Sequence, residues 1–195
     1  MTTTDLEPLK KRIKQFPFYT EDAFDIAAPY FKQLIIKKGD YYLTEGKVSK
    51  SIAFIVSGLF RTYYLKDGLE VTTCFCKENS FTTSYKSLIT KQPSDLSIQA
   101  IEDAELLVIQ FEDLKKLYEK HLFWQQVGRL VAEQEFVVMA SYTRFLNDKT
   151  AKQRYLDILN NENDILQRVP LIYLASYLQI APETLSRIRK EISAS

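Results

Sequence analysis

Residues 51–76 read SIAFIVSGLFRTYYLKDGLEVTTCFC, and this stretch decides the fold. Two runs rich in β-branched and aromatic residues flank Asp67-Gly68, a dipeptide that two-residue hairpin turns favour. Gly58 separates a third run of the same kind from the first two. Runs this short, bounded by turn residues, are typical of antiparallel strands. The stretch therefore predicts a β-hairpin whose turn is Asp67-Gly68.

The same pattern of short β-like runs between turn residues extends from about Phe31 to Phe111. Further examples are LIIKKGDYY, DLSIQAI and AELLVIQ. Four of the five glycines lie in this region, and each follows a Lys, Glu, Ser or Asp, as tight turns prefer. They are Gly39, Gly46, Gly58 and Gly68. Short strands at regular spacing predict a β-sandwich or roll.

The sequence on both sides of this region is helical in pattern. Leu6, Leu9, Ile13 and Phe16 step by three and four residues, and a second short helix is expected around residues 21–28. FEDLKKLYEKH, which begins at Phe111, predicts another helix. A long helix is expected from Leu122 to Leu146, a stretch that contains no proline and a single glycine, Gly128.

Seven positions of this long helix step by three and four residues, which is coiled-coil spacing. They are Trp124, Val127, Val131, Gln134, Val138, Ser141 and Phe145. The opposite side is also apolar, with Phe123, Leu130, Phe136 and Val137. A helix that is apolar on two sides must be covered on two sides. We expect the β-rich region to cover one side and a second copy of the chain to cover the other; a central helix of a monomer is the alternative.

Composition excludes several classes of protein. The 195 residues are 46% hydrophobic and 26% charged, with a net charge of +1, which is typical of a globular protein. No apolar run is long enough to cross a bilayer, and the N-terminus has no apolar signal core, so we expect a cytoplasmic protein without a membrane partner. Cys74 and Cys76 are too few for an iron–sulfur cluster, and His121 is the only histidine. We therefore expect no metal and no cofactor.

The C-terminal stretch LASYLQIAPETLSRIRKEI, residues 174–192, has two short helical patterns with a break between them. Ala175 is small enough for close approach of a second helix, and Leu185 and Ile188 share one face of that helix. Pro182 and Glu183 suit a first helical turn. The turn needs a positive φ at Gln179, where glycine is usual, at a cost of about 1 kcal/mol. The pattern is typical of a helix-turn-helix, and a simple helical hairpin with a solvated face is the alternative.

The residues expected to point outward from the second helix carry the chemistry of DNA recognition. An arginine can bind guanine O6 and N7 in bidentate fashion, a glutamate can accept from the cytosine amine, and hydroxyls and lysines suit phosphates. The candidate DNA-binding residues are Glu183, Thr184, Ser186, Arg187 and Lys190. From Lys149 onward the chain has seven Lys or Arg and five Asp or Glu, and this small excess of positive charge weakly favours a polyanionic partner.

With the β-rich region, the long helix and the helix pair in this order, nearly the whole chain resembles the Crp/Fnr family of bacterial transcription regulators. KKGDYYLTEGKVSKSIAFIVSGLFRTYY (37–64) is similar to the family's first roll segment, with its K-G-(D/E) turn, E-G turn and I-x-x-G-x-x-(R/K) strand. PETLSRIRKEI is similar to the family's recognition helix, R-E-T-(V/L)-(S/G)-R-x-(L/I). The resemblance implies that Glu183 and Arg187 read bases and that Thr184 contacts a phosphate. Pro182 replaces a usual Arg, so one base contact is missing.

The resemblance also implies a fold of class α+β. Its parts are an antiparallel β-roll of the cyclic-nucleotide-binding jelly-roll kind with flanking helices (1–112), dimerisation helices (113–148) and a small all-α helix-turn-helix unit (149–195). In many members two strands near this unit form a wing. ENDILQRVP is too short for a confident hairpin and the chain stops at Ser195, so the wing is expected to be reduced or absent.

The family's ligand site is where this sequence departs. Cyclic-nucleotide binders carry Gly-Glu for the ribose and Arg-Ser or Arg-Thr for the phosphate. Here NSFTTSYKSLITKQPSDLSIQA places Thr83-Ser84 and Ser94-Asp95 at those positions without a gap. Both functional groups are missing, so we predict no appreciable binding of cyclic AMP or cyclic GMP. The candidate pocket for another small-molecule effector consists of Thr83, Ser84, Tyr85, Lys86, Ser94 and Asp95.

Three functions compete. The first is a homodimeric, sequence-specific DNA-binding regulator of transcription. The second is an enzyme of the cupin kind, which usually holds a metal through several histidines, and the single His121 argues against it. The third is a ligand-sensing or interaction β-roll that does not bind DNA. Exposure of Glu183, Arg187 and Lys190 on one face separates the first from the third.

Overall fold

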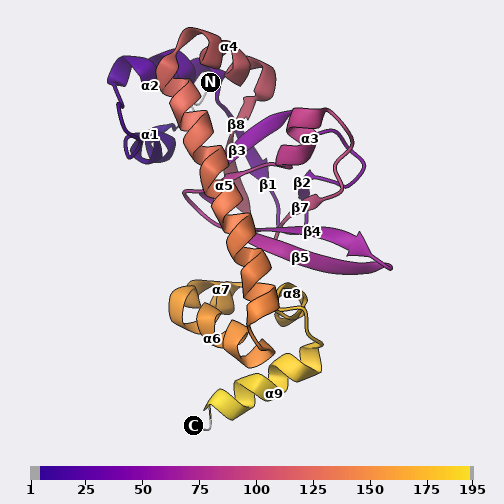
Figure 1. Cartoon of the computed structure of the whole chain (residues 1–195). Helices are drawn as coiled ribbons and strands as arrows, with labels where there is room; N and C mark the ends of the chain where they lie inside the picture. Colours follow the sequence, from indigo (N-terminus) through magenta and orange to yellow (C-terminus); the bar gives the residue numbers. More distant parts are fainter. Residues whose placement is uncertain (1–4, 194–195) are drawn as a thin grey trace.

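The computed structural model describes residues 5–193, and Figure 1 shows a β-roll with helices at one end and a helical unit at the other. The roll contains β1 (Lys32–Ile36), β2 (Tyr41–Leu43), β3 (Ser51–Ser57), β4 (Phe60–Lys66), β5 (Leu69–Cys76), β6 (Phe81–Thr82), β7 (Ser97–Ala100) and β8 (Ala104–Gln110). The helices beside it are α1 (Glu7–Ile13), α2 (Glu21–Ala27), η1 (Ala28–Tyr30), α3 (Tyr85–Thr90) and α4 (Phe111–Lys120). Then follow α5 (Leu122–Asp148), α6 (Ala151–Asn161), α7 (Asn163–Arg168), α8 (Leu171–Tyr177) and α9 (Pro182–Ser193).

The eight strands form two antiparallel sheets, in the orders β1-β8-β3-β6 and β2-β7-β4-β5. The hairpin β4–β5 projects from the roll (Figure 1). Its turn residues Asp67 and Gly68 have φ angles of 52° and 77°, the positive values that a type I′ turn requires at both positions. The predicted hairpin is therefore confirmed, and so is the α+β fold with an antiparallel roll, flanking helices and a long helix.

The roll has two apolar layers. Between the sheets lie fully buried side chains of alternating strand positions, such as Ile55, Phe60, Ile98 and Leu106. A second cluster joins the outer face of the first sheet to α1, α2, α4 and the beginning of α5. In it the indole N–H of Trp124 donates to the carbonyl oxygen of Ala23 at 2.7 Å. The beginning of α5 is thus part of the core of its own chain.

Helix α5 has 27 residues, so it is about 40 Å long, and it links the two ends of the molecule (Figure 1). Its middle is exposed and apolar: Phe136, Val137, Val138 and Met139 have 72%, 61%, 47% and 68% of their surface in solvent. Near its end the hydroxyl of Tyr142 lies 3.1 Å from the carbonyl oxygens of both Thr72 and Tyr177. The helix is therefore buried at its beginning, uncovered in its middle and attached again near its end.

This arrangement corrects part of the predicted dimer seam. Trp124 and Val127 are 2% and 5% exposed, covered by their own chain, and cannot face a partner. Gln134, Val138 and Ser141 are exposed, Val131 is half-buried, and Phe145 packs against the C-terminal helices. Trp124 and Val127 are buried, but their own chain supplies the cover, whereas Gln134, Val138 and Ser141 stay exposed in the single chain. The exposed run instead includes Phe136 and Val137, which were expected on the side of the helix opposite the predicted seam.

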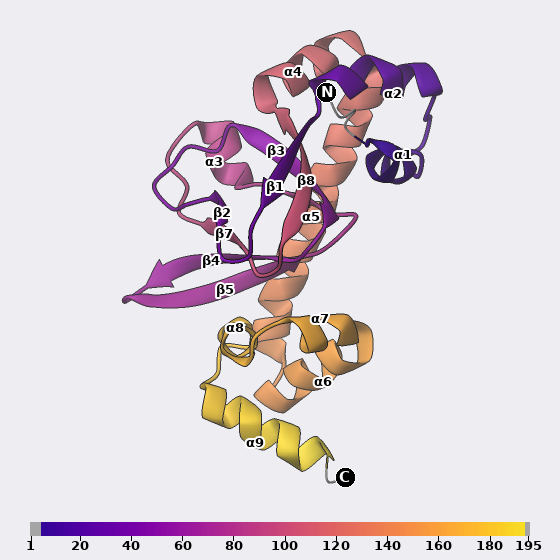
Figure 2. The ribbon, with the colours of Figure 1, turned by 180° about the vertical axis from the view of Figure 1, so that it is seen from behind.

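Helices α6 to α9 form a unit at the opposite end of α5 from α1, α2 and α4, as both views show (Figures 1 and 2). Its core is apolar and includes Tyr155, Ile165, Leu174, Leu178 and Leu185. Residues 149–193 contain no strand; Ala194 and Ser195 lie outside the described residues. Within residues 5–193 no helix combines the length and the apolar character that crossing a membrane requires.

Candidate nucleic-acid interface

The turn between α8 and α9 fixes how the two helices meet. The N–H of Ile180 donates to the carbonyl of Ala175 and the N–H of Gln179 to that of Ser176, both at 3.0 Å, which is a Schellman motif. Gln179 has a φ of 52°, as predicted for the position where glycine is usual. The chain turns sharply here, and α9 begins three residues later with Pro182 in its first turn.

One side of α9 holds the helix to α8. Leu185 and Ile188, one turn apart, are 0% and 7% exposed, and they share an apolar cluster with Leu174, Ala175 and Leu178 of α8 and its end. Burying a side chain of this size contributes about 1.5–3 kcal/mol. The small side chain of Ala175 lets the two helices approach closely, as predicted. The direction of every other side chain on α9 follows from this contact.

The opposite side of α9 points into solvent and brings the predicted DNA-binding residues together. Glu183, Ser186, Arg187 and Lys190 are exposed, and Thr184 is half-buried. Arg189 is exposed as well. At the far end of the helix Lys152 of α6 pairs with Glu191 at 2.5 Å, which ties α9 to the rest of the unit. The face therefore combines an acid, hydroxyls and cations on a helix whose back is anchored.

The hydroxyl groups of the predicted effector pocket are hydrogen-bonded within the chain. Ser84 and Ser94 are 0% and 3% exposed, and their hydroxyl oxygens lie 2.9 Å apart in a hydrogen bond. The hydroxyl of Ser94 also donates to the carbonyl of Leu96 at 2.8 Å and accepts from its N–H at 3.0 Å. Thr83 donates to the carbonyl of Ser51 at 2.9 Å. These hydroxyls already have partners within the chain.

The charged members of the same set pair with each other at the surface. The ammonium of Lys86 lies 2.6 Å from a carboxylate oxygen of Asp95, and both side chains are more than half exposed. The hydrogen bond from Lys86 lowers the pKa of Asp95. Tyr85 is 40% exposed. The six candidate residues do lie together, but they form a self-contained cluster.

The C-terminal unit is attached to the roll by an ionic cluster that the sequence analysis missed. Arg168, the last residue of α7, makes four hydrogen bonds of 2.5–3.0 Å to the carboxylates of Glu78 and Glu102. The hydrogen bond with Arg168 lowers the pKa of Glu78. Beside it, Leu59 and Ile101 of the roll are buried in the apolar core of the C-terminal unit. Nothing in the local sequence around Arg168 indicates these contacts.

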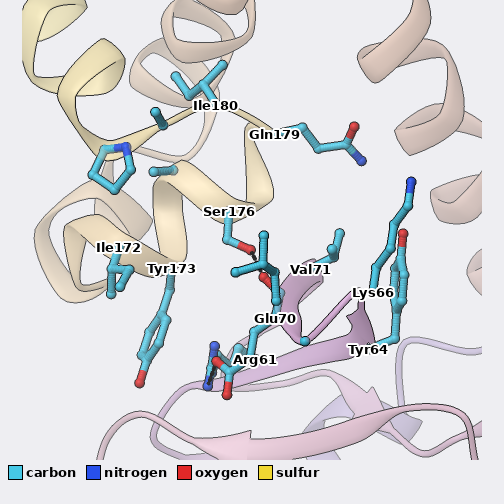
Figure 3. A pocket seen from close by; sticks show the side chains of 15 residues that line it. Arg61, Tyr64, Lys66, Glu70, Val71, Ile172, Tyr173, Ser176, Gln179 and Ile180 are labelled. Carbon is cyan, nitrogen blue, oxygen red and sulfur yellow. Dashed lines mark hydrogen bonds and ion pairs between the residues drawn. The ribbon is translucent and has the colours of Figure 1, made fainter.

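The C-terminal unit is attached to the roll at a second place, beside an open cleft of about 720 Å³. This cleft lies between the β4–β5 hairpin and the α8–α9 turn (Figure 3). Arg61 of β4 is 2% exposed, and its guanidinium stacks on the ring of Tyr173 of α8 at 3.6 Å. It pairs with Glu70 at 2.6 Å and donates to Gln99. Ser176 of α8 donates to the carbonyl of Glu70 at 2.6 Å.

The two cysteines lie on one side of β5, as expected from their spacing, and both thiols are free. Their sulfur atoms are 3.5 Å apart. The hydrogen bond with Cys76, together with burial, raises the pKa of Cys74. Cys76 packs beside the core between the two sheets. In these positions the two side chains fill space on one side of a strand.

Comparison with known proteins agrees with this architecture. Residues 33–121 match the family model of the cyclic nucleotide-binding domain. FixK2 from Bradyrhizobium japonicum is a similar solved structure, with a TM-score of 0.72 and 18% identity over 84% of this chain and 85% of that one. A putative transcriptional regulator of the Crp/Fnr family from Eubacterium rectale has the same TM-score and identity, over 92% and 87% of the two chains.

The c-di-GMP-responsive global regulator CLP from Xanthomonas campestris is also similar, with a TM-score of 0.70 and 16% identity over 90% of this chain and 92% of that one. No curated protein was found to match the chain in sequence. At these identities the likeness to the solved structures establishes the fold, which is that of Crp/Fnr-type regulators.

Proposed function

We propose that this chain is a sequence-specific DNA-binding regulator of transcription of the Crp/Fnr type, which acts as a cytoplasmic homodimer and does not respond to cyclic AMP. The observation that carries the proposal is the orientation of α9. Its apolar ridge, Leu185 and Ile188, is buried against α8, so Glu183 and Arg187 point into solvent from the second helix of the α8–α9 pair. The similar structures from Eubacterium rectale, a putative transcriptional regulator, and Xanthomonas campestris, a global regulator, support the same role. The proposal assigns no catalytic step.

The exposed face suits the major groove of B-DNA. A recognition helix reads base edges with residues near its N-terminus, and Glu183 and Arg187 lie in the first turns of α9. Arg187 would bind the O6 and N7 atoms of guanine, and Glu183 would accept from the amino group of cytosine. Thr184, Ser186 and Lys190 would bind phosphates, which fix the register on the duplex without selecting a sequence.

The homodimer is supported by the uncovered middle of α5. Phe136, Val137, Val138 and Met139 are consecutive, so together they surround the helix, and all four are substantially exposed. A run of this kind on a free helix favours association with another apolar surface. A second copy of α5 would supply that surface and would place two α9 helices on one duplex. Gln134 and Ser141, which are also exposed, would lie at the edges of the contact.

The absence of a response to cyclic AMP is supported by the serine pair. A cyclic phosphate needs a cation or several free donors, whereas the hydroxyls of Ser84 and Ser94 are hydrogen-bonded within their own chain and are buried. A ligand would have to break these bonds before it gained any of its own. Titration calorimetry with cyclic AMP should therefore show no binding at micromolar concentrations of protein. Binding with sub-micromolar affinity would contradict this part of the proposal.

Selection of bound sequences from random duplex DNA tests the function as a whole. The full-length protein should enrich a sequence with two related half-sites about one helical turn apart, as a two-fold dimer requires. Enrichment of no sequence would favour the alternative, an interaction or ligand-sensing roll without DNA binding.

Arg187→Ala tests the assignment of the base-reading residue on the selected site. We expect a loss of about 1–3 kcal/mol in binding and a relaxed preference at one base pair. Arg189→Ala is the matched control, because it removes an exposed cation from the same helix at a position not assigned to base reading. It should weaken specific and random DNA alike. Equal effects of the two variants would show that Arg187 does not read a base.

A further inference from the structure

Three turns of the roll meet at the end that faces α7. They are residues 58–59 between β3 and β4, residues 77–80 between β5 and β6, and residues 101–103 between β7 and β8. Each turn contributes to the contact with the C-terminal unit. Leu59 and Ile101 insert into the apolar core of that unit, and Glu78 and Glu102 bind Arg168. The roll thus offers a docking surface made of one apolar pair and one acidic pair.

Arg168 uses all three of its guanidinium nitrogens in this contact. Nε and Nη2 donate to the two oxygens of Glu102 at 2.9 and 2.5 Å, and Nη1 and Nη2 donate to the two oxygens of Glu78 at 3.0 and 2.8 Å. Paired donors on a planar group hold both its position and its orientation, which a single ammonium cannot do. The three side chains are only 25–33% exposed, so solvent screens the pairs less than at an open surface.

The acidic pair is itself held in place. An oxygen of Glu78 also accepts the N–H of Gly58 at 3.0 Å. Gly58 has a φ of 94°, and a Cβ at that position would lie 2.6 Å from the side chain of Ala104, so the turn cannot shift to accommodate a larger residue. Lys77 of the neighbouring turn pairs with Asp164 of α7 at 2.8 Å. Both ends of the Arg168 cluster are therefore anchored.

The position of α7 determines the position of the DNA-reading face. Helix α7 lies between α6 and α8 in the chain, and Ile165 and Val169 share the core of α8 and α9. A rotation of the C-terminal unit about the end of α5 would have to break the Arg168 cluster, the contact of Arg61 with Tyr173 and the bonds of Ser176. In the predicted effector pocket the hydroxyls of Ser84 and Ser94 are bonded to each other.

We propose that Arg168 is a positioning residue, which holds α9 in one fixed orientation relative to the roll so that the chain binds DNA without an effector. The inference rests on the proposed function. The buried hydroxyls of Ser84 and Ser94 are already bonded to each other, so this pair offers no free donor to a ligand that would change the orientation. In this proposal the orientation that the Arg168 cluster holds is the one that binds DNA.

The first test needs no DNA. Arg168→Met removes the four bonds and keeps most of the apolar stem, and Lys37→Met is the control, since Lys37 pairs with Asp103 within the roll at 2.8 Å. Hydrogen exchange of the full-length chain should become faster in α7 and in residues 77–80 of the Arg168 variant only; residues 101–103 include Asp103, the partner of Lys37, and are left out of the comparison. Unchanged exchange in these segments would show that the cluster does not hold the unit, and the proposal would fail.

The second test uses duplexes that carry the selected half-sites at the selected spacing and at spacings one and two base pairs longer or shorter. Wild-type protein should prefer one spacing, because a fixed orientation sets the distance between the two α9 helices. The Arg168→Met variant should bind the preferred duplex about 10- to 100-fold more weakly, within the usual range of coupling between sites. It should also discriminate less among spacings, whereas Lys37→Met should match the wild type.

Two further variants cover the case in which Arg168→Met does not fold. Arg168→Lys keeps the charge but not the paired donors, and Glu102→Gln removes one of the two carboxylates. Each should give an intermediate loss of affinity and an intermediate loss of spacing preference. Wild-type spacing preference in both variants would overturn the role of Arg168. A wild-type protein that selects no DNA would instead overturn the proposed function, while the exchange experiment would still decide whether the cluster holds the unit.

Discussion

The outer face of α9 and the serine pair of the roll use similar side chains in opposite ways. On α9 the hydroxyl of Ser186 and the charges of Glu183 and Arg187 extend into solvent from a helix anchored on its other side. In the roll the hydroxyls of Ser84 and Ser94 are buried and bonded to each other. Polar groups that lie close together therefore do not by themselves make a binding site. A site also needs donors and acceptors that the chain itself has not already satisfied.

The largest effect should come from removing the support behind the α9 face. Leu185→Ala empties a fully buried position between α8 and α9, and it should lower the free energy of unfolding by about 2–5 kcal/mol. Chemical denaturation followed by circular dichroism measures this loss, and binding to the selected DNA should fall with it. Ile172→Ala, at a position 62% exposed on α8, is the control and should change stability by less than about 0.5 kcal/mol. Similar losses for both variants would mean that the ridge does not anchor α9.

The next largest effect should come from the serine pair of the roll, Ser84 and Ser94. Ser94→Ala deletes a hydroxyl that bonds with Ser84 and with both backbone groups of Leu96, and it leaves the buried Ser84 without that partner. The expected loss of stability is about 1–3 kcal/mol. Thr90→Ala, which removes an exposed hydroxyl from α3, serves as the control in thermal and urea denaturation. A stable Ser94 variant that gained affinity for cyclic AMP would show that the serine pair alone had blocked the site.

A smaller effect, a gain in stability, is expected at the turn between α8 and α9. Gln179 holds a φ of 52°, which glycine adopts without strain, so Gln179→Gly should stabilise the C-terminal unit by up to about 1 kcal/mol. Gln179→Ala keeps the strain and should give no such gain. Comparison of the two variants by urea denaturation isolates the backbone contribution. A loss of stability in the glycine variant would instead reveal that the glutamine side chain matters more than the backbone.

The smallest effect concerns the exposed pair beside the serines. Lys86 lowers the pKa of Asp95 below its ordinary 3.8, so the charged carboxylate stabilises the fold above that pH and the contribution disappears as the pH falls through the lower folded value. Because the pair is exposed, Asp95→Asn should cost less than about 0.5 kcal/mol at pH 7. Thermal unfolding between pH 7 and pH 3 should show the two proteins converging on acidification. A difference that grew as the pH fell would contradict the assigned sign.

The features that the sequence predicted correctly are governed by local chemistry. Asp67-Gly68 specifies a turn by the φ angles it tolerates, and Gln179 occupies a position defined by the helix that precedes it. The orientation of α9 follows from the spacing of Leu185 and Ile188. In each case the residues that decide the outcome lie within one or two turns of one another.

The features that the sequence did not predict depend on contacts between distant segments. Arg168 binds carboxylates that are 66 and 90 residues away, and no periodicity marks it. Trp124 has the spacing of a seam residue, but the carbonyl of Ala23, 101 residues away, receives its indole N–H within the same chain. A heptad pattern predicts that a side chain is covered, but it does not identify the segment or chain that covers it.

The exposed middle of α5 has a consequence for how the protein melts. In the proposed homodimer a second copy would cover Phe136 and Met139 and lower the free energy of the folded state, which would link folding to association by mass action. The melting temperature should then rise as the sample is concentrated and fall as it is diluted, a dependence that a self-sufficient monomer does not have.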